Sequence, residues 1–245
     1  MKATASVLAA ASLAVIACGN EPVASGDVLA LTVCDPAKDA ACRPVADGRS
    51  LVTVTACAPE GNRVSPLDVK LRLSSSGWLS PSDPTDRRTF TASLATERCV
   101  APAFVADTQP GPVRVDADLL GFRATAFVVL APAPLQSLTI VPAPATLVAG
   151  QVNSVTLTPA ASATNGGAPS KGTRVSWAVT EVVPASGVAF VLPAESDLES
   201  TNPIQLHTDS TVTRVSVRAT AVPPVTDGAP AAASASATLT ISVLP

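Results

Sequence analysis

The sequence predicts an all-β fold made of two antiparallel β-sandwiches in tandem. Hydrophobic residues make up 47% of the 245 residues, but only 3% are aromatic and tyrosine is absent, so the core must consist mainly of Ala, Val and Leu. The 23 prolines are spread along the chain, and proline removes an amide donor and clashes inside a helix. Many short runs alternate apolar and polar residues between turn residues, which is typical of half-buried strands.

The first residues predict an export signal rather than part of the fold. Lys2 supplies a positive charge, and the apolar run 7–17 is too short to cross a bilayer as a helix. The run ends in Val-Ile-Ala-Cys-Gly at 15–19, which resembles the lipobox of bacterial lipoproteins. This resemblance implies a signal peptide over 1–17, cleavage between Ala17 and Cys18, and transfer of diacylglycerol to the Cys18 thiol.

Acylation of Cys18 would make the lipid bilayer a partner of the mature chain. Each methylene buried in the bilayer contributes about 0.8 kcal/mol to the free energy of membrane binding. One acyl chain therefore binds only marginally, whereas two or three keep the protein on the membrane. An ordinary secretory signal with an incidental cysteine is the alternative. Gly19 stands where enterobacterial lipoproteins of the inner membrane carry Asp, so the resemblance favours the outer membrane. Residues 18–27 are then a short, lipidated tether.

The first predicted sandwich spans residues 28–131. In the run 68–73, Val69, Leu71 and Leu73 fall on one face and the charged residues between them on the other, as in a half-buried antiparallel strand. Six further strands are expected, at 28–33, 50–56, 87–94, 100–106, 114–119 and 122–130.

The second predicted sandwich spans residues 132–245. Ala-Pro-Ala-Pro at 131–134 predicts a stiff, extended connector in front of it. Seven strands are expected, at 135–141, 152–158, 174–180, 188–192, 203–208, 212–221 and 235–243. The low-complexity stretch 227–234 predicts a loop before the last of them. Two units of about seven strands are typical of tandem β-sandwiches.

Four cysteines remain when Cys18 is set aside, and an even number in an exported chain predicts two disulfides. They are Cys34, Cys42, Cys57 and Cys99, which allow three pairings. We favour Cys34–Cys42, because these two bracket a polar, turn-rich stretch, and Cys57–Cys99. A metal site is the alternative, although the spacing of the first pair does not match that of zinc ligand pairs.

A series of short motifs follows a defined order in the first unit. They are Ala46-Asp47-Gly48, an alternating strand at 52–56, Gly61-Asn62, an aliphatic strand from Val69 to Gly77, a Thr-rich strand at 89–92 and a Val-x-Val strand at 113–117. Over residues 28–130 this order resembles the bacterial immunoglobulin-like domains of invasin and intimin, although Cys57 and Cys99 are not requirements of that family. The second unit is more weakly similar to such repeats, through 138–142 and 148–151. The resemblance implies two immunoglobulin-like sandwiches that serve as stalks or adhesive modules without catalysis.

Few residues are candidates for catalysis or ligand binding. The net charge is −3 and no basic stripe occurs, so nucleic acid is not expected as a partner. His207, the only histidine, has Asp209 and Ser210 near it, but no nucleophile-elbow motif occurs and we expect no catalysis. Of the two tryptophans, Trp177 is expected in the core, whereas Trp78 in a turn is either core or an exposed anchor for a ligand.

Two aspartates are candidates for a calcium site. Asp116 and Asp118 are two positions apart, so a strand would point both to the same face. With Asp83 or Asp86 from a loop they would supply oxygen ligands for Ca²⁺. Arg114 and Arg123 are equally placed to pair with them, and we favour a solvated sheet face without a metal.

Together these features predict a non-enzymatic lipoprotein of the cell envelope, without cofactors. Its two sandwiches would act as a binding, adhesion or spacer module for a protein or glycan ligand. The alternative is a periplasm-facing scaffold or assembly component of an envelope complex.

Overall fold

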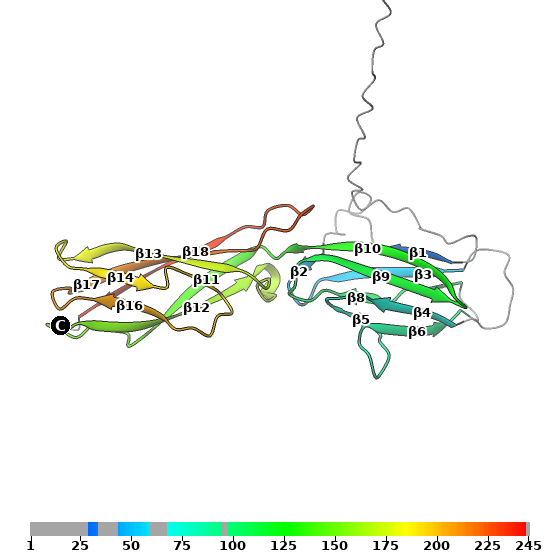
Figure 1. Cartoon of the computed structure of the whole chain (residues 1–245), viewed down its shortest axis with the longest axis horizontal. Coiled ribbons are helices and arrows are strands. Elements are labelled where there is room, and N and C mark those ends of the chain that lie inside the picture. The colour runs from blue at the N-terminus through cyan, green and yellow to red at the C-terminus, as the bar shows by residue number, and fades with distance from the viewer. Residues whose placement is uncertain (1–28, 34–43, 59–67, 95–97, 244–245) are drawn as a thin grey trace, which may run out of the picture.

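The computed structural model shows two β-sandwiches that lie end to end along the long axis of the molecule (Figure 1). It describes residues 29–33, 44–58, 68–94 and 98–243. These residues form eighteen β-strands and one short 3-10 helix, η1 (Thr164–Gly166). No helix of the described residues is long and apolar enough to cross a membrane.

The N-terminal sandwich consists of two five-stranded sheets. The first contains, in order, β1 (Ala30–Val33), β3 (Leu51–Cys57), β8 (Ala103–Val105) and β5 (Trp78–Ser80), with β7 (Cys99–Val100) paired to β3. The second contains β2 (Val45–Ala46), β10 (Phe122–Pro132), β9 (Gly111–Leu119), β4 (Asp68–Leu73) and β6 (Thr89–Ser93). Neighbouring strands are antiparallel except β2, which runs parallel to β10.

The C-terminal sandwich consists of two four-stranded sheets. One contains β11 (Leu135–Ala143), β12 (Asn153–Ala163), β16 (Ile204–Thr208) and β14 (Ala189–Leu192). The other contains β15 (Glu195–Asp197), β13 (Arg174–Val183), β17 (Arg214–Val222) and β18 (Ala235–Ser242). All of these neighbours are antiparallel.

Each sandwich has its own core of mostly small aliphatic side chains. In β4, Val69, Leu71 and Leu73 are buried while Lys70 and Arg72 are exposed, as the alternation predicts. The N-terminal core closes around Phe104, and the C-terminal core contains Trp177 at 6% exposure. The two clusters share no residue, so the predicted all-β fold of two tandem sandwiches is confirmed.

Most of the predicted strands are present, with boundaries shifted by a few residues. The short strands β2, β5, β7 and β15 were not predicted, because two or three residues show no periodicity. The placement of Trp78 in a turn is therefore wrong, since Trp78 begins β5. The connector is also shorter than expected: Ala131 and Pro132 belong to β10 and pair with β2, which leaves only Ala133 and Pro134 before β11.

A disulfide joins Cys57 at the end of β3 to Cys99 in β7, where the two residues lie directly opposite each other. This is the pairing favoured from the sequence. Ala17 and Cys18 of the predicted cleavage and lipidation site lie outside the described residues, as do Cys34 and Cys42.

Candidate binding surface at the junction of the two sandwiches

The side chain of Ser170 joins the two sandwiches. Its hydroxyl donates a hydrogen bond to the carbonyl oxygen of Ala46 at the end of β2, at 2.9 Å, and accepts one from the amide of Ala133 in the connector, at 2.7 Å. Ser170 itself is only 1% exposed. A hydroxyl can donate and accept at once, so this one group satisfies two backbone groups that lie far apart in the chain.

Asp47 forms the second part of the junction. Its carboxylate Oδ1 accepts hydrogen bonds from the amides of Arg49 and Ser50, which fixes the turn after β2. Its carbonyl oxygen accepts a hydrogen bond from the amide of Ala168, at 2.9 Å. A Cβ atom on the neighbouring Gly167 would lie 2.8 Å from the Cβ of Asp47, so only glycine permits this approach.

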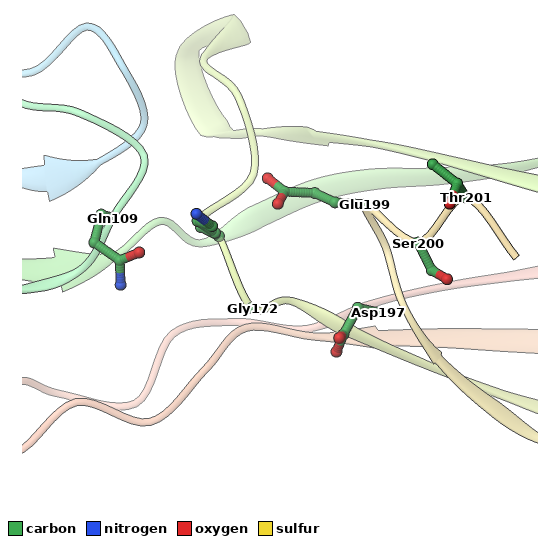
Figure 2. Close-up of a pocket in the computed structure, with 7 residues that line it drawn as sticks. Gln109, Gly172, Asp197, Glu199, Ser200 and Thr201 are labelled. Atoms are coloured by element: carbon green, nitrogen blue, oxygen red, sulfur yellow. The ribbon is translucent and has the colours of Figure 1, made fainter.

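A polar hollow of about 580 Å³ opens between the sandwiches. Figure 2 shows Gln109, from the N-terminal sandwich, on one side and Asp197, Glu199, Ser200 and Thr201 on the other. Lys171 and Gly172 complete the lining, and the amide of Lys171 donates a hydrogen bond to the carbonyl oxygen of Thr108. An amine, two carboxylates, an amide and two hydroxyls offer hydrogen bonds of both kinds to a polar ligand.

A second hollow, of about 370 Å³, lies on the N-terminal sandwich around Trp78. The guanidinium carbon of Arg87 lies 4.5 Å from the centre of the Trp78 ring, a cation–π contact. Beneath it, Gly77 has φ +96, and a Cβ atom there would lie 2.5 Å from the Phe104 ring. Gly77 therefore lets the half-buried Trp78 lie close to β8. Ser75, Ser76, Arg88 and Asp107 complete the lining.

The segment 107–109 connects the two hollows. Asp107 lines the hollow around Trp78, and Gln109 lines the hollow between the sandwiches. Thr108, between them, is bonded through its carbonyl oxygen to Lys171 of the C-terminal sandwich. We call the two hollows together the junction surface. It combines an aromatic ring, arginines and carboxylates from both sandwiches, which suits recognition of a polar or charged ligand.

Asp116 and Asp118 point to the same face of β9, as predicted, where arginines pair with them. The Nε atom of Arg114 lies 2.8 Å from Oδ1 of Asp116, and that of Arg123 lies 3.3 Å from Oδ2 of Asp118. The described residues contain no group of three or more carboxylate, histidine or cysteine side chains placed to hold a metal ion. Asp83 and Asp86 instead accept hydrogen bonds from the hydroxyls of Thr91 and Thr89 in β6.

His207 lies on the outer face of the C-terminal sandwich, opposite Phe190 of the edge strand β14. The two rings are 5.3 Å apart. The carboxylate of Asp209 accepts hydrogen bonds from the amide of Val188 and from the amide and hydroxyl of Thr211, so it caps a turn and does not orient the imidazole. His207 lines neither hollow of the junction surface.

The main junction residue gave no signal in the sequence. Ser170 is one serine among many, and only its burial between two distant backbone groups distinguishes it. Asp47 did stand out, as part of the motif Ala46-Asp47-Gly48, but its contact with Ala168 depends on tertiary structure.

No family model matches the sequence, and no curated protein sequence does. The structure is similar to that of invasin, described as a bacterial integrin-binding protein, with a TM-score of 0.55 and 17% identity over 88% of this chain and 39% of the invasin chain. The adhesin InvE of Yersinia pseudotuberculosis aligns with 93% of this chain and 62% of its own, at 17% identity and a TM-score of 0.49. The chain thus spans less than two thirds of either structure. Identity this low concerns the fold alone: the described residues have the tandem bacterial immunoglobulin-like fold of the invasin type.

Proposed function

We propose that the chain is a non-catalytic, lipid-anchored module of the bacterial cell envelope that holds a binding surface at a fixed distance from the membrane. The observation that carries this proposal is the bond network of Ser170. Because one buried hydroxyl ties β2, the connector and the loop before β13 together, the two sandwiches are expected to move as one body. A rigid rod is what a spacer requires.

The proposed anchor is supported by the run 15–19, which resembles a lipobox, and by the burial of the first described residue. Leu29, at the first described position, is fully buried in the N-terminal core. The folded part therefore starts within about ten residues of Cys18. An acylated Cys18 would hold the N-terminal sandwich close to a bilayer and direct the C-terminal sandwich away from it.

A binding or adhesion role is supported by the fold shared with invasin, whose described partner is an integrin. For this chain we propose a protein or glycan ligand at the junction surface. Trp78 and Arg87 provide a stacking face with a positive charge, and Lys171 with Glu199 provides hydrogen-bonding groups from the other sandwich. Such a bipartite surface keeps its shape only while the junction holds.

The anchor is tested by fractionation of cells that express the chain and its Cys18→Ser variant. We expect the unaltered chain in the membrane fraction with incorporated fatty acid, and the variant released in soluble form with no label. Equal release of both chains would contradict the proposal. The soluble variant should keep the unfolding transition of the unaltered chain, which shows that only anchoring has changed.

Added protease separates display on the cell surface from the alternative role inside the envelope. Degradation on intact cells is expected for an adhesive or spacer module at the surface. Protection on intact cells, with degradation after the outer membrane is opened, would favour a periplasm-facing scaffold. The ligand is then sought by cross-linking on the accessible side of the membrane, and the yield of cross-linked product is compared between the Trp78→Ala and Val225→Ala variants. Val225→Ala is the control, because the side chain of Val225 is exposed and lies outside the junction surface.

A further inference from the structure

The turn between β9 and β10 presents an apolar tip. Leu119 pairs with Phe122, which leaves Leu120 and Gly121 as a two-residue hairpin turn. The side chain of Leu120 is 70% exposed and that of Phe122 is 46% exposed. Leu119, which pairs with Phe122, is fully buried in the N-terminal core. The exposed apolar side chains of the tip therefore adjoin this core.

The backbone of Leu120 makes this leucine unexpected. With φ +53, it is the one residue other than glycine with positive φ among the described residues. Two-residue hairpin turns of this kind favour asparagine or glycine, since a bulky side chain is strained there. The hydrogen bond from the amide of Gly121 to Oδ1 of Asp118 already holds the turn. A leucine that is both strained and exposed is better explained by a contact of its side chain than by the needs of the turn.

The tip lies at the end of the N-terminal sandwich that faces away from the C-terminal sandwich (Figure 1). β10 starts at the tip with Phe122 and ends at the junction with Pro132. β1 starts at the same far end, because Ala30 pairs with Cys57, the end of β3 remote from the junction. The first described strand thus starts at the end that carries the tip.

The chain length between Cys18 and the fold limits the distance of this end from an anchored Cys18. Leu29 is fully buried in the core, and ten residues, 19–28, separate it from Cys18. Eleven Cα–Cα steps join Cys18 to Leu29, so the two residues lie at most about 40 Å apart. A bilayer that holds Cys18 therefore lies no farther than this from Leu29, at the far end of the N-terminal sandwich.

We propose that the β9–β10 tip is a second membrane contact, with Leu120 and Phe122 inserted at the lipid interface. Apolar side chains beside a cation suit the lipid interface. The apolar side chains enter the boundary of the acyl chains, and the charge stays among the lipid headgroups. Arg123, next to Phe122, has a side chain that is 81% exposed, and its guanidinium supplies the cation while its Nε stays 3.3 Å from Oδ2 of Asp118. This inference rests on the proposed lipid anchor and deepens it. Two membrane contacts, the acylated Cys18 and the β9–β10 tip, would fix the tilt of the two sandwiches relative to the bilayer, whereas a single tether would not.

The test uses full-length chains recovered from membranes and placed in vesicles of phosphatidylethanolamine and phosphatidylglycerol, with and without brominated acyl chains. A Leu120→Trp variant reports on the tip, and Phe122→Trp is a second reporter. Val152→Trp is the matched control, because Val152 is 75% exposed in the β11–β12 connection of the other sandwich. The fluorescence of the unaltered chain, with Trp78 and Trp177, is subtracted.

We expect brominated lipid to quench the added tryptophan at 120 or 122, with a blue-shifted emission, and to leave the one at 152 unchanged. Chains that float with the vesicles but show equal fluorescence at all three positions would overturn the tip contact and leave the anchor standing. Chains that do not float would overturn both. A blue shift that requires envelope proteins, and is absent with lipid alone, would assign the tip to a protein partner and also overturn the inference.

Discussion

The hydroxyl of Ser170 donates a hydrogen bond to the carbonyl oxygen of Ala46, 124 positions earlier in the chain. The Oγ atom of Ser170 also accepts a hydrogen bond from the amide of Ala133, so the connector cannot move without breaking a buried bond. Thr173 contributes further, because its hydroxyl donates to the carbonyl oxygen of Ser170 at 2.6 Å. The junction is thus a small polar network rather than an extension of either apolar core.

Replacing Ser170 with Ala should both destabilise the chain and loosen the junction. The substitution leaves the carbonyl of Ala46 and the amide of Ala133 buried without their partner, and each unsatisfied group costs about 1–3 kcal/mol. We expect a lower midpoint in chemical denaturation and a broader distribution of interatomic distances in solution scattering.

Ser154→Ala is the control for the junction variant. The hydroxyl of Ser154 donates to Oε1 of Gln205 on an exposed face, near the start of β12 at Asn153, whereas β12 approaches the connector at its other end, Ala163. It should change neither the midpoint nor the scattering curve. If Ser170→Ala lowers the midpoint and leaves the distance distribution unchanged, the hydroxyl stabilises the fold without fixing the two sandwiches relative to each other.

Removing the disulfide between Cys57 and Cys99 should destabilise the N-terminal sandwich. The two cysteines are 42 positions apart, and closing a loop of that length is worth about 4 kcal/mol in the chain-entropy model. A Cys57→Ala, Cys99→Ala double variant should therefore unfold at lower denaturant concentration. The paired variant Cys34→Ala, Cys42→Ala should lose less, because the proposed Cys34–Cys42 disulfide would close a shorter loop.

Thiol titration of the unfolded, non-reduced protein separates the pairings. If Cys18 is acylated and Cys34 is paired with Cys42, as we propose, the unaltered chain should show close to no free thiol, because Cys57 and Cys99 are bonded to each other. The Cys57→Ala, Cys99→Ala variant should also show none. Two free thiols in that variant would mean that Cys34 and Cys42 are not bonded to each other.

The Asp209 carboxylate should make the turn after β16 sensitive to acid. The hydroxyl of Thr211, followed by the amides of Val188 and Thr211, stabilises the charged form and lowers the pKa of Asp209 below its usual value of 3.8. A lowered pKa in the folded state means that the stabilisation is present above the unfolded-state pKa. It is lost as the pH falls through the folded-state pKa.

Thr211→Val tests this assignment, because it removes the hydroxyl and keeps the amide. The pKa of Asp209, followed by NMR of its carboxyl carbon, should rise toward the usual value in the variant. Above pH 5 the variant should be less stable than the unaltered chain, and the difference should shrink as the acid protonates Asp209. An unchanged pKa would show that the backbone amides alone stabilise the carboxylate.

The alternation of apolar and polar residues predicted the regular strands of the fold. It did not predict the contacts between segments that lie far apart in the chain. Alternating runs such as 68–73 identify a strand and its buried face, because every second side chain must enter the core. The strand of Trp78 was missed, since its three residues show no period and a run of serines precedes it. The approach of Gly167 to Asp47 and the bridge of Ser170 were equally hidden, because each depends on a partner more than a hundred positions away.

Calcium should have no effect on the stability of the N-terminal sandwich. Both candidate carboxylates already have cationic partners, and Oδ1 of Asp116 also accepts a hydrogen bond from the hydroxyl of Thr125. We therefore expect equal melting temperatures in excess chelator and in millimolar Ca²⁺. Asp116→Asn should cost about 0.2–1 kcal/mol, the value of an exposed ion pair, in both conditions. A melting temperature that rises with Ca²⁺ in the unaltered chain, and not in Asp116→Asn, would instead establish a calcium site on this face and displace the ion pairs as its explanation.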